Sequence, residues 1–221
     1  MRDQTQPFPP REQQRGLAGD PEALVSQLGS PEGLEGMGLV GEALRNRKIG
    51  SVAELRKFLS DYRAQVLLPL ELPAICRAFE HTRKFEVREL IELDQSLSRE
   101  PLLKDFATAS QCIGRGQLRL LKPLRDQKLI KRYLEAIAKR EAHGWHTVVY
   151  GVILSVFSFP LRPGLISYAN QTMRGFVYSS SCPLLLPQSV GDELVEEVTA
   201  GLPTATNTLL EEHGHASLQL L

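Results

Sequence analysis

The sequence predicts an all-α protein, folded as a single-domain bundle of about eight to ten helices. Apolar residues recur at spacings of three and four through most of the chain after residue 30, which is the period of an amphipathic helix. Period-two alternation bounded by hairpin turns, the pattern typical of strands, is not found. With 221 residues, of which 42% are hydrophobic, the chain is long enough to bury one substantial core.

Composition divides the chain into three parts. Residues 1–30 are rich in Pro, Gln, Arg and Gly and lack apolar periodicity, which predicts a poorly ordered N-terminal tail. Residues 31–213 are expected to form the helical domain, and residues 214–221 a flexible C-terminal tail. The first residues match neither a secretory signal nor a transit peptide, so we expect a cytoplasmic protein.

Charge and cysteine content argue against several classes of protein. The 26 Lys and Arg residues balance the 26 Asp and Glu residues, so no overall charge attracts nucleic acid or anionic lipid. Cys76, Cys112 and Cys182 are widely separated, which fits a reducing compartment. The apolar run over residues 145–159 is shorter than the roughly 20 residues that span a bilayer. We therefore expect no membrane segment.

Helix signals begin at residues 51–54, where Ser-Val-Ala-Glu forms a capping box. The apolar stripe that follows predicts a helix that ends near Leu68, because Pro69 comes next. The run over residues 148–157 is apolar on all sides, which predicts a helix at the centre of the bundle. Further helices are predicted over residues 70–84, 86–98, 101–121, 128–141, 162–180, 191–199 and 203–212.

Two histidines, His143 and His146, stand at the start of this central run and have two interpretations. They could share a helix face and ligate a metal, but no HExxH or CxxC motif supplies further ligands. The second interpretation, the start of a buried helix, is favoured, so we expect no metal site and no cofactor. No GxSxG elbow surrounds the serines at 179–181, and we expect no enzymatic activity.

Two glycines, Gly114 and Gly116, lie inside a predicted helix, where each costs about 1 kcal/mol relative to Ala. Their spacing is not that of a phosphate-binding loop. Ser110 and Gly114 are small and one helical turn apart, so we predict that another helix approaches closely here.

A basic run over residues 115–132 suggests an alternative function, a helical module that binds RNA or phosphate. Aromatic residues that would stack on bases are sparse, with only Tyr133 nearby, so a solvated or protein-docking face is favoured. The basic residues are Arg115, Arg119, Lys122, Arg125, Lys128, Lys131 and Arg132. A metal-dependent hydrolase that uses His143, His146 and acidic residues is the third hypothesis.

Three stretches of the chain carry a family resemblance. They are GLEGMGLVGEALRNRKIGSVAELRKFLSDYRAQVLLPLELPAI at 33–75, SQCIGRGQLRLL at 110–121, and HTVVYGVILSVFSFPLRPGLISYANQTMRGFVYSSSCPLLLPQSVGDEL at 146–194. In this order they resemble the Gly-Leu-Glu segment, the Gly-Arg-x-x-Leu-Arg-Leu helix and the closing Gln-x-x-Gly motif of the urease accessory protein F family. Members of that family assist nickel insertion into urease. The resemblance covers about residues 33–200.

The sequence departs from the family pattern at several positions. LVSQLGSPE at 24–32 stands where the family has Asp-Ser-x-x-Pro-x-Gly-Gly-Phe. Single residues also differ: Cys112 and Cys182 replace a usual arginine, Thr147 and Leu185 a usual proline, and Asp192 a common glutamine.

The resemblance implies an all-helical homodimer that acts as a scaffold or chaperone in metallocentre assembly. It would bridge the urease-binding accessory protein, called D or H, to the GTPase accessory protein G on apo-urease. Nickel ligation would fall mainly to these partners. The residues implied in partner contact or helix packing are Glu35, Gly114, Arg115, Arg119, Gln188 and Gly191, with Tyr168 and Arg174 as weaker matches.

Overall fold

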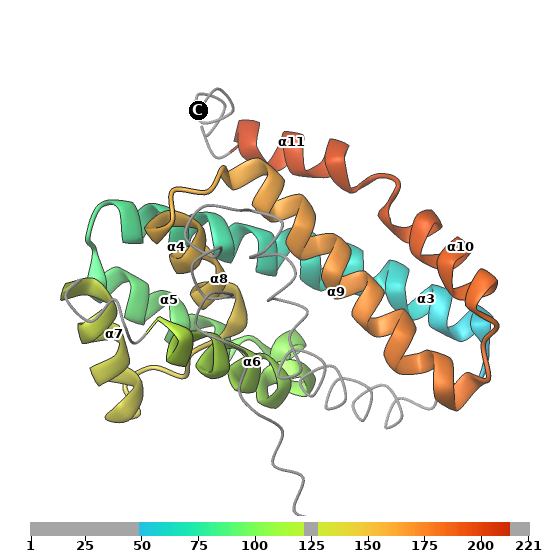
Figure 1. Ribbon diagram of the computed structural model, residues 1–221, viewed down its shortest axis with the longest axis horizontal. Helices are drawn as coiled ribbons and strands as arrows, with labels where there is room; N and C mark the ends of the chain where they lie inside the picture. Colours follow the sequence, from blue (N-terminus) through green and yellow to red (C-terminus); the bar gives the residue numbers. More distant parts are fainter. Residues whose placement is uncertain (1–48, 122–127, 213–221) are drawn as a thin grey trace, which may run out of the picture.

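The computed structural model describes residues 49–121 and 128–212, which form a body of packed helices (Figure 1). None of the described helices is both long and apolar enough to cross a membrane. In chain order the elements are α3 (Val52–Tyr62), the π-helix η2 (Arg63–Glu71), α4 (Leu72–Arg83), α5 (Val87–Arg99), the 3-10 helix η3 (Pro101–Phe106), α6 (Ala107–Leu120), α7 (Lys128–Ala138), α8 (His146–Val156), α9 (Leu161–Leu184), α10 (Gln188–Thr199) and α11 (Leu202–Glu212).

No strand occurs within these described ranges, which confirms the predicted all-α class. The number of helices depends on how uninterrupted segments are counted. Residues 52–83, for example, form one helical segment or three, so the number of helices in the described residues differs at most slightly from the predicted eight to ten. The tails expected at 1–30 and 214–221, and Glu35, lie outside the described residues.

The capping box at the start of α3 is confirmed with one difference. The Ser51 hydroxyl accepts a hydrogen bond from the Glu54 amide at 3.2 Å, as predicted. The Glu54 carboxylate accepts from the amide of Gly50 at 2.8 Å, one residue further back than the capping residue itself. The hydrogen bond from the Gly50 amide favours the ionised carboxylate and is the largest cause of the lowered pKa of Glu54.

The prediction that the first helix ends near Leu68 is wrong. Helical backbone continues from Val52 to Arg83, and Pro69 lies inside the π-helix η2. A π-helical turn is one residue wider than an α-helical turn. The wider turn accommodates a proline ring that lacks an N–H and would clash with the preceding turn of an α-helix.

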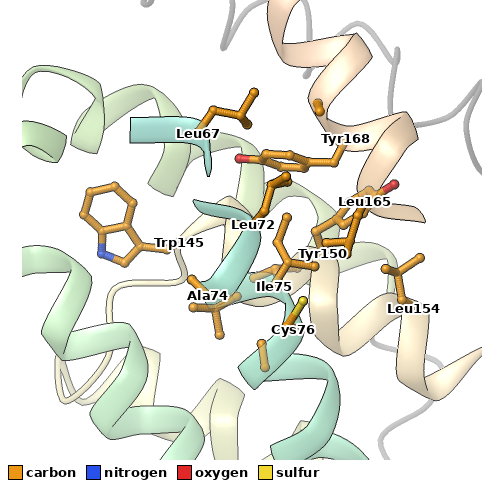
Figure 2. Packing of buried hydrophobic residues seen from close by; sticks show 14 of the residues in the cluster. Leu67, Leu72, Ala74, Ile75, Cys76, Trp145, Tyr150, Leu154, Leu165 and Tyr168 are labelled. Carbon is orange, nitrogen blue, oxygen red and sulfur yellow. The ribbon is translucent and has the colours of Figure 1, made fainter. Parts of the chain in front are cut away.

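The core of the molecule lies where α4 crosses α8. Every residue of α8 from Thr147 to Leu154 is buried, which confirms the prediction of a central helix. Figure 2 shows Tyr150 of α8 beside Ile75 of α4 and close to Leu165 of α9, with Leu154 of α8 farther to the right. The crossing brings the two backbones close together, because a Cβ added at Gly151 would lie 2.6 Å from the carbonyl oxygen of Ile75.

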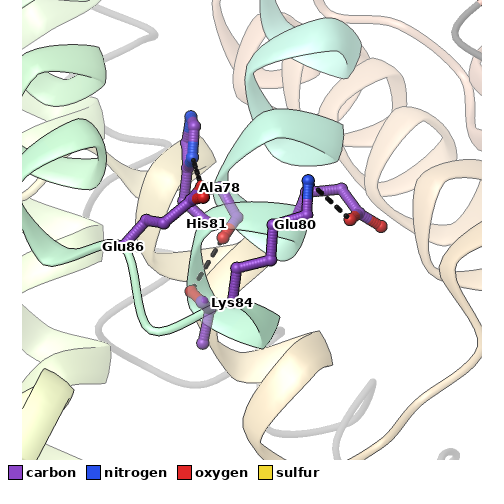
Figure 3. A network of polar contacts seen from close by, with 6 residues as sticks. Ala78, Glu80, His81, Lys84 and Glu86 are labelled. Carbon is purple, nitrogen blue, oxygen red and sulfur yellow. Dashed lines mark hydrogen bonds and ion pairs between the residues drawn. The ribbon is translucent and has the colours of Figure 1, made fainter.

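A local network of polar contacts forms the turn between α4 and α5 (Figure 3). Phe85 adopts the left-handed conformation, with φ at 59°, which costs energy for a residue with a side chain. The Glu86 amide donates to the carbonyl of His81 at 2.8 Å, and the two side chains also meet at 2.8 Å. These contacts stabilise the turn, and α5 packs against α4 beyond it.

We expect Gly151→Ala to lower the free energy of unfolding by about 2 kcal/mol, because overpacking a rigid core costs roughly 1 to 3 kcal/mol. The added methyl group meets the backbone of α4, which has no room to move. Urea denaturation measures the loss.

Gly201→Ala is the matched control, because the methyl group there meets only the flexible guanidinium end of Arg63. We expect that change to stay within about 0.5 kcal/mol. Equal stability of the two variants would contradict the close approach of α4 and α8.

Candidate functional site

The implied residues that the structure describes lie on α6 and on the pair of helices α9 and α10. Helix α6 packs against α8, whereas α9 packs against α10. Helix α6 holds Gly114, Arg115 and Arg119, α9 holds Tyr168 and Arg174, and α10 holds Gln188 and Gly191. We call the exposed face around Arg115 and Arg119 the α6 surface.

The α6 surface rests on a buried carboxylate, that of Asp94 in α5. Asp94 has no exposed area. Its two oxygens accept hydrogen bonds from the amides of His143 at 2.5 Å, Gly144 at 2.9 Å and Trp145 at 3.1 Å. The Tyr133 hydroxyl donates a fourth hydrogen bond at 2.7 Å. Successive amides that converge on one anion form a nest, which satisfies the charge without a neighbouring cation.

Two further hydrogen bonds hold the connection between α7 and α8 against α5. The Trp145 indole N–H donates to the Ser98 hydroxyl at 2.8 Å, and the Gln95 side chain donates to the carbonyl of Glu141 at 2.8 Å. Gly144 lies between these contacts with φ at 73°, a conformation that favours glycine. The connection is therefore held in one conformation over its last residues.

Gly114 lies directly beneath this connection. A Cβ at Gly114 would lie 2.8 Å from the amide nitrogen of His146 and 2.9 Å from the carbonyl carbon of Trp145. The His146 amide also donates to the Ser110 hydroxyl at 3.1 Å. Ser110 and Gly114 therefore permit the predicted close approach, and the backbone that approaches is the start of α8.

Arg115 is positioned by the same connection, although it is exposed. A Cβ added to Gly144 would lie 3.0 Å from the side-chain Cγ of Arg115. The Arg115 Nε donates to the carbonyl of Gln111 at 3.0 Å. Arg119 follows one turn later and is also exposed. Two permanently charged guanidinium groups thus project from one face of α6, where they can bind carboxylates of a partner.

The structure places neither His143 nor His146 in a cluster of metal ligands within the described residues. Among the described residues no group of three or more His, Cys, Asp or Glu side chains is arranged to hold an ion. His146 keeps partial exposure as a residue, but its Nε2 is enclosed and has no hydrogen-bond partner among the described groups. Burial lowers the pKa of His146 to about 4, so its ring is neutral at neutral pH.

Tyr168 is buried and does not lie on a surface. Its ring is 5.2 Å from the rings of both His146 and Tyr150. It also hydrogen-bonds the buried carboxyl of Glu71, which accepts from the Tyr62 hydroxyl at 2.7 Å. Burial raises the pKa of Glu71 to about 7, although both hydrogen bonds act in the opposite direction. Tyr168 therefore supports packing between α9 and η2.

The remaining implied residues differ in exposure. Arg174 is exposed on α9, and Gln188 is exposed at the first position of α10. Gly191 is buried one turn later. Arg174 and Gln188 are thus available for contact, and Gly191 supports packing.

Asp94 is the most connected polar residue of the site, and the sequence interpretation did not single it out. A signal for it exists, because Asp94 lies four residues after Leu90 and three before Leu97, on the apolar stripe of α5. A charged residue in such a stripe requires several hydrogen-bond donors from elsewhere in the fold. The donors themselves lie 39 to 51 positions away in the chain.

The described residues thus form a helical protein in which the buried carboxylate of Asp94 holds the connection between α7 and α8. Arg115 and Arg119 are exposed on α6 beside this connection. The sequence model of the UreF family matches residues 49–180, which is 132 of the 221 residues. The chain belongs to the UreF family. No curated protein matches it. UreF proteins are accessory proteins rather than enzymes, and membership implies a role in nickel insertion into urease together with other accessory proteins.

We expect Asp94→Asn to lower the free energy of unfolding by about 3 kcal/mol, since hydrogen bonds to a buried charge are worth more than neutral ones. The amide that replaces one oxygen would face backbone N–H groups that it cannot satisfy. Tyr133→Phe removes a single donor and is expected to cost about 1 kcal/mol. If urea denaturation gives the same loss of unfolding free energy for both variants, the hydrogen bonds from the amides of His143, Gly144 and Trp145 contribute nothing to stability.

Glu71 gives the protein a pH dependence whose sign is set by its raised pKa. The unfolded carboxyl ionises near 4.5 and the folded one near 7. The stabilisation is complete below 4.5 and is lost as the pH rises through about 7, by about 3 kcal/mol. Relative to Glu71→Gln, the wild type should lose that amount between pH 4.5 and 8 in urea denaturation. Parallel pH profiles of the two proteins would contradict this assignment.

Proposed function

We propose that this chain is a non-catalytic scaffold, or chaperone, in the assembly of the urease metallocentre. It would join the urease-binding accessory protein, D or H, to the GTPase accessory protein G on apo-urease in the cytoplasm, as a homodimer. Residues 31–213 would form the working domain. The family match over residues 49–180 supports this proposal more than any single contact does.

The α6 surface is the proposed contact region for one of these partners. Arg115 and Arg119 are exposed, while the residues beneath them are held by the Asp94 nest and by the contact at Gly114. A binding surface on a rigid support loses less conformational entropy when a partner binds. Arg174, Gln188 and Glu35 are proposed as further contacts, and Gly114, Tyr168 and Gly191 as packing residues that support them.

The alternative of an RNA- or phosphate-binding module has less support from the described part of the basic run. Arg132 and Lys139 line a groove together with Arg88 of α5, and the same groove is lined by three acidic residues, Glu92, Glu135 and Glu141. We call it the α5–α7 groove. The three carboxylates balance the three basic groups, so the groove has no net positive charge to attract phosphate. Lys122 and Arg125 lie outside the described residues.

The proposed function is tested by expressing urease structural and accessory proteins with and without this chain. We expect urease made without it to contain less nickel and to show lower activity. Equal nickel content in the two cultures would refute an accessory role. Loss of nucleic-acid binding with rising salt, without any effect on urease, would favour the alternative.

Arg115→Glu combined with Arg119→Glu is expected to abolish co-purification with the accessory partners, because it reverses both charges of the α6 surface. Helicity should be unchanged, since both side chains are exposed. Circular dichroism and affinity co-purification measure the two effects.

Lys131→Glu combined with Arg132→Glu is the matched control, because it reverses two exposed basic residues of α7. We expect this control to co-purify normally. Normal co-purification of the α6 double variant would refute the assignment of the surface.

A further inference from the structure

One face of α9 forms a groove in which all charged lining residues are basic. Arg162, Ile166, Asn170 and Arg174 follow one another at intervals of four residues, and Thr199 at the end of α10 lies at the edge. The groove holds about 540 Å³. We call it the α9 groove. Its lining combines two guanidinium groups with apolar and amide side chains.

The charge of the α9 groove distinguishes it from the α5–α7 groove. No acidic side chain lines it among the described residues, whereas three carboxylates line the α5–α7 groove. The Arg162 guanidinium donates to the neutral side-chain oxygen of Asn207 at 2.7 Å, so this contact leaves its charge uncompensated. Arg174 is exposed. The groove therefore suits a segment that carries carboxylates among apolar residues.

The chain itself contains such a segment at residues 16–44. It holds no Lys, Arg or His, and leucine, valine and methionine are interspersed along it. Its acidic residues are Asp20, Glu22, Glu32, Glu35 and Glu42. The segment thus matches both properties of the α9 groove, the basic charge and the partly apolar lining.

The chain length between the segment and the body allows the two to meet. Helix α3 lies beside α9 and α10 (Figure 1), and Arg56 pairs with Glu197 at 2.9 Å, two residues before Thr199. Val52, where α3 begins, is about 6 Å along the helix axis from Arg56. Residues 45–51 span up to about 24 Å when extended. Residue 44 can therefore reach the α9 groove without strain.

We propose that residues 16–44 of this chain bind in its own α9 groove, with their carboxylates beside Arg162 and Arg174. The interaction joins two parts of one polypeptide, so its effective concentration is high even if each contact is weak. If the proposed function holds, a partner that needs Arg174 competes with this segment for the groove. The binding of the segment itself does not depend on any partner.

Photo-cross-linking of the purified full-length chain, without partners, tests the proposal. Gln171 lies in the groove lining and is replaced by the photoreactive benzoylphenylalanine. We expect cross-linked peptides from residues 16–44, in a band with the mass of a single chain. The same photoreactive residue at Lys139, in the α5–α7 groove, is the matched control and should give no such peptides.

Charge variants decide whether the carboxylates cause the binding. Glu32→Gln with Glu35→Gln should lower the cross-linking yield about fivefold, the size expected for exposed charge pairs, and 0.5 M salt should lower it in the wild type. Cross-links between two chains would assign the groove to a second copy and overturn the proposal. Cross-links to other segments, or a yield unchanged by the variants, would overturn it as well. If the same variants still support normal nickel insertion, that result bears on the proposed function and not on the binding of residues 16–44 in the groove.

Discussion

The carboxylate of Asp94 is the constraint on which the α6 surface depends. It is buried in α5 and binds the amides of His143, Gly144 and Trp145, which precede the central helix α8. An isolated charge in the interior costs much more than a paired one, so the connection keeps the conformation that supplies these donors. In that conformation the start of α8 packs against Gly114, and Gly144 contacts the aliphatic part of the Arg115 side chain.

A second buried carboxyl, Glu71, holds α9 to the long helical segment that begins with α3. Tyr62 precedes the π-helix η2 and Glu71 ends it, and the hydroxyl of the first donates to the carboxyl of the second. Nine residues separate the pair in the chain, and Tyr168 of α9 binds the same carboxyl. The segment that accommodates Pro69 thus also brings together the buried polar groups that connect α9 to the core.

Local patterns predicted those features whose cause lies within a few residues. The capping box at 51–54 and the central position of the apolar run at 148–157 followed from spacing and side-chain type. The helix end predicted near Leu68 failed because the rule about proline assumes α-helical geometry, and a π-helix accommodates the ring. Asp94 was missed because its donors come from a connection about fifty residues away.

The sequence by itself determined the helical class, the family, and the small residues that let α6 approach a neighbour. It did so because helix periodicity and motif spacing are properties of neighbouring residues. Only the tertiary structure decided which implied residues are accessible: it exposes Arg115, Arg119, Arg174 and Gln188 and buries Tyr168 and Gly191. Burial is set by which helices pack together, and hydrogen bonds between distant segments, such as those of Asp94, select that arrangement.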